Sequence, residues 1–139
     1  MAQLRKRYNA WYDDVSSTRP DNYAPPRIVV GTTHEPETWL TMQDLRAVGP
    51  GWGTSGSWPI RVEKAGTFRL EMHGLTPYPK GTSVTVGNGE SKRSGALENG
   101  IVVVKQFRLS AGDHDLSAMV HVSRKTALPH QVRVTRETP

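Results

Sequence analysis

The sequence of 139 residues contains no cysteine. Disulfides, thiolate metal sites and cysteine nucleophiles are therefore all excluded. The absence does not identify a cellular compartment, because many exported proteins also lack cysteine. A chain of this length fits one domain, with room for a short appendage, and it can bury a core without covalent staples.

Long apolar segments are also missing from the sequence. Hydrophobic residues make up 35% of the chain, and no run approaches the length of a membrane span or of a signal-peptide core. We therefore expect no membrane partner. The chain contains 13 glycines and 10 prolines. This high content of turn-forming residues favours many short strands over long helices.

The net charge of +5 is a modest basic excess. Such an excess can attract nucleic acid, acidic membrane or sulfated glycan. The basic residues are dispersed, however, and mixed with acidic ones, as on an ordinary solvated surface. None of the short basic clusters alternates with aromatic residues as in proteins that bind single strands, so we expect no nucleic-acid partner. Those clusters are residues 5–7, 92–93 and 124–125.

Residues 58–72 are the stretch around which the rest of the chain is organised. Apolar side chains alternate with polar ones over residues 58–62 and again over residues 68–72. Successive side chains of a strand point to opposite faces, so each run has one apolar face. Lys64 to Thr67 is short and contains Gly66, which predicts a hairpin loop between the two strands. A hairpin with one apolar face needs a second layer to cover it. Trp58 is assigned to the core.

A helix is predicted over residues 4–15, because its apolar residues recur at spacings of three and four and so share one face. That stripe consists of Leu4, Tyr8, Trp11, Tyr12 and Val15. The helix is expected to end before Pro20, since proline disfavours helix at the preceding residue. A helix this short is marginal alone and needs a surface for its stripe. The stripe is thus a candidate interdomain docking surface.

Further strands are predicted along the rest of the chain. They cover residues 27–31, 82–86, 101–109, 114–122 and the last segment around Val132 and Val134. Residues 39–45 are predicted to be a strand that runs into a turn. Residues 90–100 are predicted to be a loop. About seven or eight short strands separated by turn residues are typical of an all-β sandwich or jelly roll. We therefore predict a helical segment at residues 1–20 and a β-sandwich domain at residues 21–139.

The sequence also resembles a known family. The similarity lies in Tyr8-Asn-Ala-Trp-Tyr-Asp-Asp-Val-Ser16, Pro25-Pro-Arg-Ile-Val-Val-Gly31, Leu40-Thr-Met-Gln-Asp44, Gly51-Trp-Gly53, the Trp58 strand, Ala65-Gly-Thr-Phe68 and Leu109-Ser-Ala-Gly112. These motifs resemble the C-terminal portion of bacterial arylsulfatase-like proteins of the formylglycine-dependent sulfatase family. In that family a helix leaves the catalytic domain and a strand then enters an accessory β-domain.

The resemblance implies that the chain is an accessory domain without the catalytic domain. The family's catalytic signature, Cys-x-Pro-Ser-Arg or its serine-led variant, is absent, and residues 16–20 lack the proline that it needs. No catalytic residue, metal ligand or cofactor carries over. The implied partner is the sulfatase catalytic domain of a parent protein, itself expected to be a periplasmic or secreted sulfuric ester hydrolase. The start at Met1 followed by basic residues fits a position inside a longer chain.

A different function is suggested by aromatic residues in or beside loops. Trp39, Trp52 and Tyr78 offer faces on which the apolar side of a sugar ring could stack. The alternative hypothesis is therefore a carbohydrate-binding module for glycans, sulfated ones included. The competing interpretation is that Trp52 folds back over the edge of the sandwich.

Residues for catalysis or metal binding are few. The five histidines show no metal-like spacing, and only His114 between Asp113 and Asp115 resembles a cation site at a turn. No nucleophile elbow appears, and Glu35 and Glu37 have no evident support as acid–base groups. A small independent hydrolase remains a third hypothesis without a nominated residue. We expect no metal, no cofactor and no catalytic residue in this chain.

Overall fold

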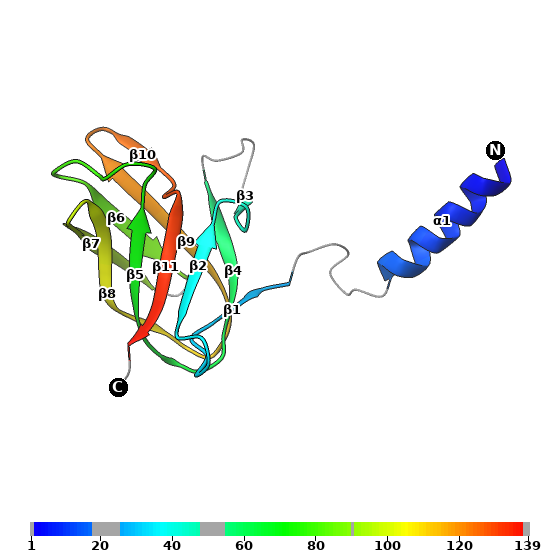
Figure 1. Cartoon of the computed structure of the whole chain (residues 1–139), viewed down its shortest axis with the longest axis horizontal. Coiled ribbons are helices and arrows are strands. Elements are labelled where there is room, and N and C mark those ends of the chain that lie inside the picture. Colours follow the sequence, from blue (N-terminus) through cyan, green and yellow to red (C-terminus); the bar gives the residue numbers. More distant parts are fainter. Residues whose placement is uncertain (1, 18–25, 48–54, 90, 138–139) are drawn as a thin grey trace.

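The computed structural model describes residues 2–17, 26–47, 55–89 and 91–137 of the chain. These residues form one helix followed by eleven strands. Figure 1 shows the helix, α1, standing apart from the strands, which gather into one body. The prediction of an all-β domain with a short N-terminal helix is confirmed.

Helix α1 spans Ala2–Ser17, which confirms the helix expected from the apolar spacing. Its last turn is closed by side chains of its own. The hydroxyls of Ser16 and Ser17 donate hydrogen bonds to the carbonyl oxygens of Asp13 and Asp14, at 3.2 and 2.9 Å. Both are local bonds from a side chain to the carbonyl three residues earlier in the helix.

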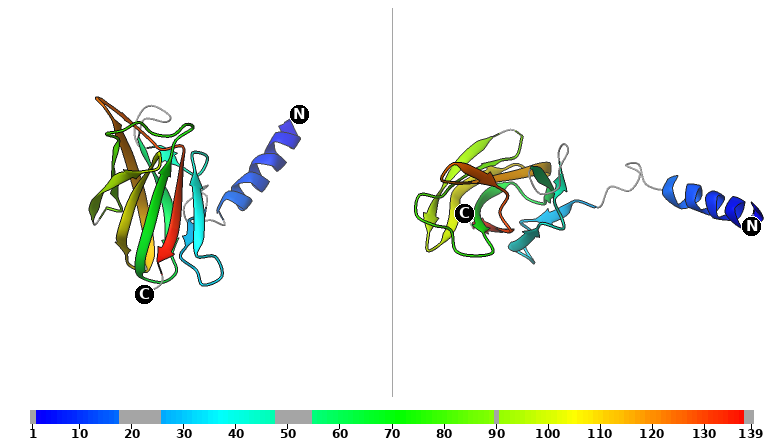
Figure 2. Two further views of the ribbon diagram at one scale, coloured as in Figure 1. Left: turned by 60° about the vertical axis from the view of Figure 1, so that its left-hand side comes forward. Right: turned by 90° about the horizontal axis from the view of Figure 1, so that it is seen from above.

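The strands form a nearly closed sheet that folds over on itself into two layers (Figure 2). The first layer contains, in spatial order, β1 (Ile28–Val30), β4 (Gly56–Val62), β9 (Gly112–Val122), β6 (Ser83–Gly87) and the first half of β7 (Lys92–Glu98). The second contains the end of β7, then β8 (Ile101–Leu109), β5 (Gly66–His73), β11 (Gln131–Glu137) and β2 (Glu37–Thr41). Two short strands pair at the edges, β3 (Arg46–Ala47) with β4 and β10 (Lys125–Ala127) with β9.

The core lies between the layers and is built from the alternating strands. The six large apolar residues that alternate in the organising stretch are buried, and they are Trp58, Ile60, Val62, Phe68, Leu70 and Met72. Val132 and Val134 of β11 are buried with them, as predicted. The indole nitrogen of Trp58 donates a hydrogen bond of 2.7 Å to the carbonyl oxygen of Thr41. Its one polar group is thereby satisfied inside the core, which confirms Trp58 as a core residue.

The predicted hairpin between the two strands of the organising stretch is wrong. β4 pairs with β1, β3 and β9, whereas β5 pairs with β8 and β11. Residues 63–65 therefore carry the chain from one layer to the other. The apolar faces of β4 and β5 meet across the core instead of lying side by side. Alternation reveals which face of a strand is buried, but not which strand is its neighbour.

Two other details of the strand prediction need correction. Residues 92–98 form strand β7 and not a loop, and the described strands number eleven where seven or eight were predicted. Three of the eleven, β1, β3 and β10, have only two or three residues. β7 was missed because it contains no β-branched residue and is mostly exposed. It nevertheless links the two layers, pairing with β6 and then with β8.

Candidate functional site

The apolar stripe of α1 is exposed to solvent in this structure. Its five residues retain between 44% and 70% exposure, and they are Leu4, Tyr8, Trp11, Tyr12 and Val15. The Tyr8 ring lies 5.9 Å from that of Trp11 and 6.0 Å from that of Tyr12, between centroids. The aromatic side chains thus form one continuous surface on the helix. Exposed apolar surface of this kind marks interaction sites.

Another exposed aromatic residue, Trp39, lies on the outer face of the second layer. Trp39 is 42% exposed and belongs to β2, next to Arg133 of β11 in the strand register. The Arg133 guanidinium carbon lies 5.7 Å from the centre of the indole ring. The His73 ring lies 5.1 Å from it at an interplanar angle of 52°. Trp39 is therefore a platform bordered by one cationic and one imidazole side chain.

The polar neighbours of Trp39 belong to a network of ion pairs across this face. Glu71 of β5 is only 7% exposed, and its carboxylate lies 2.7 Å from Arg69 Nε and 3.2 Å from an Arg133 Nη atom. Burial alone raises the pKa of Glu71, but the hydrogen bond and charge of Arg69 and the charge of Arg133 outweigh it and hold the pKa below its usual value. Arg133 also pairs with Glu37.

Arg133 also shifts the pKa of Glu37, the second carboxylate with which it pairs. The hydrogen bond from Arg133 is the main cause that lowers the pKa of Glu37, and the same bond raises the pKa of Arg133. The indole nitrogen of Trp39 donates a further bond of 3.2 Å to Glu37. Glu37 thus fixes the indole of Trp39, and Arg133 in turn fixes Glu37. Such preorganised polar groups beside an aromatic face are suited to fixing the orientation of a polar ligand.

Tyr78 lies in a different place from Trp39. It lines a hollow of about 280 Å³ together with six other described residues, namely Met42, Gly74, Leu75, Leu128, Pro129 and His130. The side chain is partly buried against the core, and this burial raises its pKa. The third nominated aromatic, Trp52, lies outside the described residues. The structure therefore does not combine Trp39 and Tyr78 into one site.

His114, Asp113 and Asp115, which were considered as a cation site, bind other groups of the protein. His114 is buried, and its Nε2 atom lies 2.9 Å from the Ser110 carbonyl oxygen. Asp113 pairs with Arg61 at 2.7 Å, and Asp115 pairs with Arg27 at 2.8 Å. The hydrogen bond from Arg61 is the main cause that lowers the pKa of Asp113. Within the described ranges, no group of three histidine or acidic side chains is arranged to hold a metal ion.

Sequence reasoning found Trp39 but missed its surroundings. Arg69 and Glu71 occupy successive outward positions of β5, and Arg133 occupies the facing position of β11. Charged residues at the centre of a strand, two positions apart, were the available signal. Only the register of the strands shows that they meet. A second polar feature, an arginine-lined pocket at the end of the domain, had no sequence signal of its own.

No protein-family model matches the chain, and no curated protein matches it. No helix in the described part of the chain is long and apolar enough to cross a membrane.

Proposed function

We propose that the chain is a noncatalytic β-sandwich domain of a sulfatase-like protein, docked through α1 on the catalytic domain and shaping access to its substrate. The observation that carries this proposal is the exposed aromatic stripe of α1. An isolated helix of this length is marginal in water, so a stripe of this size is best explained by a surface that covers it. Burying one such side chain contributes about 1.5–3 kcal/mol.

The choice of a sulfatase catalytic domain as the partner rests on the resemblance. The motifs of residues 8–16 and 25–31 resemble the junction at which, in that family, a helix of the catalytic domain leads into the accessory domain. In the structure α1 covers the first of these motifs, and β1 lies within the second. The absence of the catalytic signature from the sequence supports a noncatalytic role for this chain.

The size of the native protein in its source, detected by an antibody raised against this chain, tests the proposal. We expect a band far heavier than the 15.4 kDa of the chain, and sulfate-ester hydrolysis in the immunoprecipitate. Preimmune serum is the control. A band at the size of the chain, or a heavy band without hydrolysis, would refute the proposal.

A second candidate function, a carbohydrate-binding module, is favoured by the surroundings of Trp39. An exposed indole bordered by Arg133 and His73 offers both a stacking face and hydrogen-bond donors for sugar hydroxyls. Titration with sulfated and unsulfated glycans should change tryptophan fluorescence and the NMR signals of β2 and β11.

Trp39→Ala should abolish the binding, and Trp11→Ala is the matched control, because it removes an exposed indole from α1. Absence of any change at millimolar glycan would rule this function out. Equal loss in both variants would also contradict it, since the binding would not be specific to the face around Trp39.

A further inference from the structure

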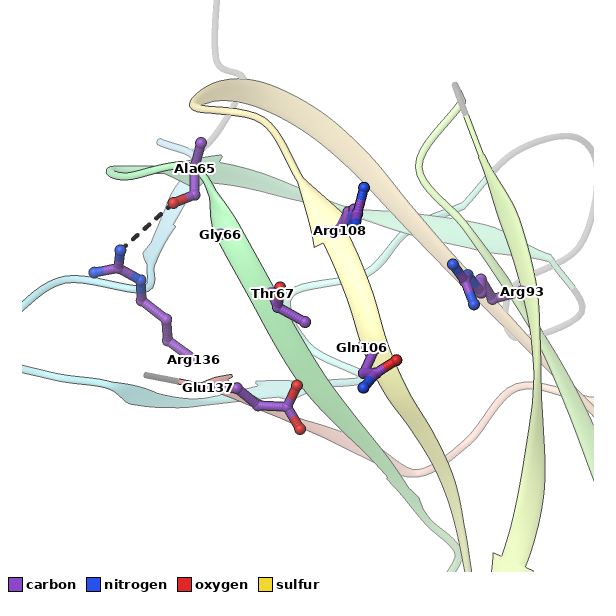
Figure 3. A pocket seen from close by; sticks show the side chains of 8 residues that line it. All are labelled: Ala65, Gly66, Thr67, Arg93, Gln106, Arg108, Arg136 and Glu137. Carbon is purple, nitrogen blue, oxygen red and sulfur yellow. Dashed lines mark hydrogen bonds between the residues drawn. The ribbon is translucent and has the colours of Figure 1, made fainter. Parts of the chain in front are cut away.

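A pocket of about 430 Å³ opens at the end of the domain where β5 begins and β8 and β11 end. Figure 3 shows its lining side chains, with Arg136 and Glu137 on one side of β5 and with Gln106, Arg108 and Arg93 on the other. We call it the arginine pocket. Its lining consists of Ala65, Gly66, Thr67, Arg93, Gln106, Arg108, Arg136 and Glu137.

The charge of the arginine pocket is strongly one-sided. Three arginines from three strands, β7, β8 and β11, face a single acidic residue, Glu137. Within the described ranges none of these three arginines forms an ion pair. By contrast, Arg27, Arg61, Arg69 and Arg133 are each paired with carboxylates elsewhere on the domain. The pocket therefore carries an excess of positive charge.

Arg136 is held at the pocket by the backbone just before β5. Its Nη2 atom donates a bond of 3.4 Å to the Ala65 carbonyl oxygen. A Cβ at Gly66 would stand 3.3 Å from its Nε atom, so the glycine leaves space for the guanidinium. That Nε is buried, and among the described residues it has no hydrogen-bond partner. A buried donor without a partner is costly, and it indicates a ligand that would satisfy it.

A bulge in β8 forms the opposite wall. The pairing of β5 with β8 shifts by one residue between Phe68 and Leu70, and Gln106 takes a left-handed φ of 54° there. A non-glycine residue in that region stores strain of about 1–3 kcal/mol. Bulges commonly re-aim side chains beside functional sites. This one places the Gln106 amide in the pocket next to Arg108.

We propose that the arginine pocket binds a tetrahedral oxyanion, the sulfate or phosphate group of an ester. Arg108 and Arg136 supply planar guanidinium donors that match such an oxyanion, and Arg93 adds charge from β7. Thr67 and Gln106 supply neutral donors. Glu137 accepts a hydrogen bond from a hydroxyl on the group that carries the ester. This inference stands independently of both functions proposed above.

Titration of the full chain, followed by NMR of backbone amides and arginine Nε–H groups, tests the proposal. The probes are inorganic sulfate, inorganic phosphate, glucose 6-sulfate, glucose 6-phosphate and, as the uncharged control, glucose. Sodium chloride keeps the ionic strength constant, because screening alone alters weak ionic contacts. We expect saturable shifts at residues 66–67, 106, 108 and 136. The tighter of the two esters identifies the group that the pocket recognises.

Arg108→Gln should weaken binding of the tighter ester at least about tenfold, since a hydrogen bond to a charged group contributes about 1.5–3 kcal/mol. Arg61→Gln is the matched control, because it removes the same charge from an exposed arginine outside the pocket. Arg136 is not chosen for this test, because its guanidinium also donates a hydrogen bond to the Ala65 carbonyl oxygen.

Three results would overturn the proposal. One is the absence of a saturable shift at millimolar probe. Another is equal weakening in Arg108→Gln and Arg61→Gln, which would indicate a general charge effect. The third is binding of glucose as tight as that of its esters, which would mean that no oxyanion is recognised.

Discussion

Helix α1 and the facing strands β4 and β5 are two amphipathic regions that differ in whether their apolar face is buried. Each carries a regular stripe of large apolar side chains, at helical spacing in α1 and in strict alternation in the strands. The strand stripes are buried in the core, from Trp58 to Met72. The helix stripe is exposed, with Trp11 at 58%. An apolar pattern thus determines which face seeks burial, but whether that face is covered depends on what lies opposite.

The largest expected effect contrasts the two regions directly at a tryptophan. Trp58→Ala should lower the free energy of unfolding by about 3–5 kcal/mol, because it opens a cavity in the core and removes the partner of the Thr41 carbonyl. Trp11→Ala should change it by no more than about 0.5 kcal/mol, as expected for an exposed site. Urea denaturation followed by far-UV circular dichroism measures both. A comparable loss in the two variants would show that α1 belongs to the core.

Close packing inside the sandwich gives the second effect. Gly95 of β7 faces the core, where an added Cβ would stand 2.7 Å from the Val103 carbonyl oxygen and 2.7 Å from a Val84 methyl. Gly95→Ala should therefore cost about 1–3 kcal/mol through overpacking. Gly87→Ala is the matched control, since its Cβ would meet no atom nearer than 3.4 Å. Thermal unfolding compares them, and equal midpoints would contradict the packing of β7 described above.

The same strand shows where prediction from sequence reached its limit. The buried faces of β4, β5 and β11 were predictable, because alternation reports burial directly. The course of the chain between β4 and β5 was not, since a short turn with glycine suits a hairpin and a crossing between layers equally well. β7 was not predicted, because it is defined by its pairing with β6 and β8 and its own residues do not favour a strand.

The candidate sites were predictable to a smaller extent. Trp39 was nominated as an aromatic residue beside a loop, and the structure adds Arg133 and His73 around it. The arginine pocket draws Arg93, Arg108 and Arg136 from three separate strands. No spacing along the sequence signals such a convergence, which depends on register and on a single bulge.

A smaller effect concerns the charged outer face and depends on pH. The folded-state pKa of Glu71 is lowered, so its pairing contributes stability that is present above its ordinary value of 4.5 and is lost as the pH falls through the folded-state pKa. Glu71→Gln should therefore be less stable than the unchanged protein at neutral pH, by about 1 kcal/mol. The difference should vanish in acid.

Urea denaturation at a series of pH values measures that difference. Glu35→Gln serves as the control, because Glu35 is exposed and its backbone, not its carboxylate, makes the local hydrogen bonds with Thr32. A difference between Glu71→Gln and the unchanged protein that stays constant with pH would exclude a charge effect.

The smallest expected effect returns to α1. Deleting residues 1–20 should lower the helical signal in far-UV circular dichroism and shift the melting temperature of the strands by less than about 2 °C, because the sandwich has its own core. The deletion also separates the two regions completely. If the strands then unfold cooperatively at a much lower temperature, the stripe of α1 stabilises this domain and is not free to dock elsewhere. If they do not, the stripe is available for a partner, which is what docking on a catalytic domain requires.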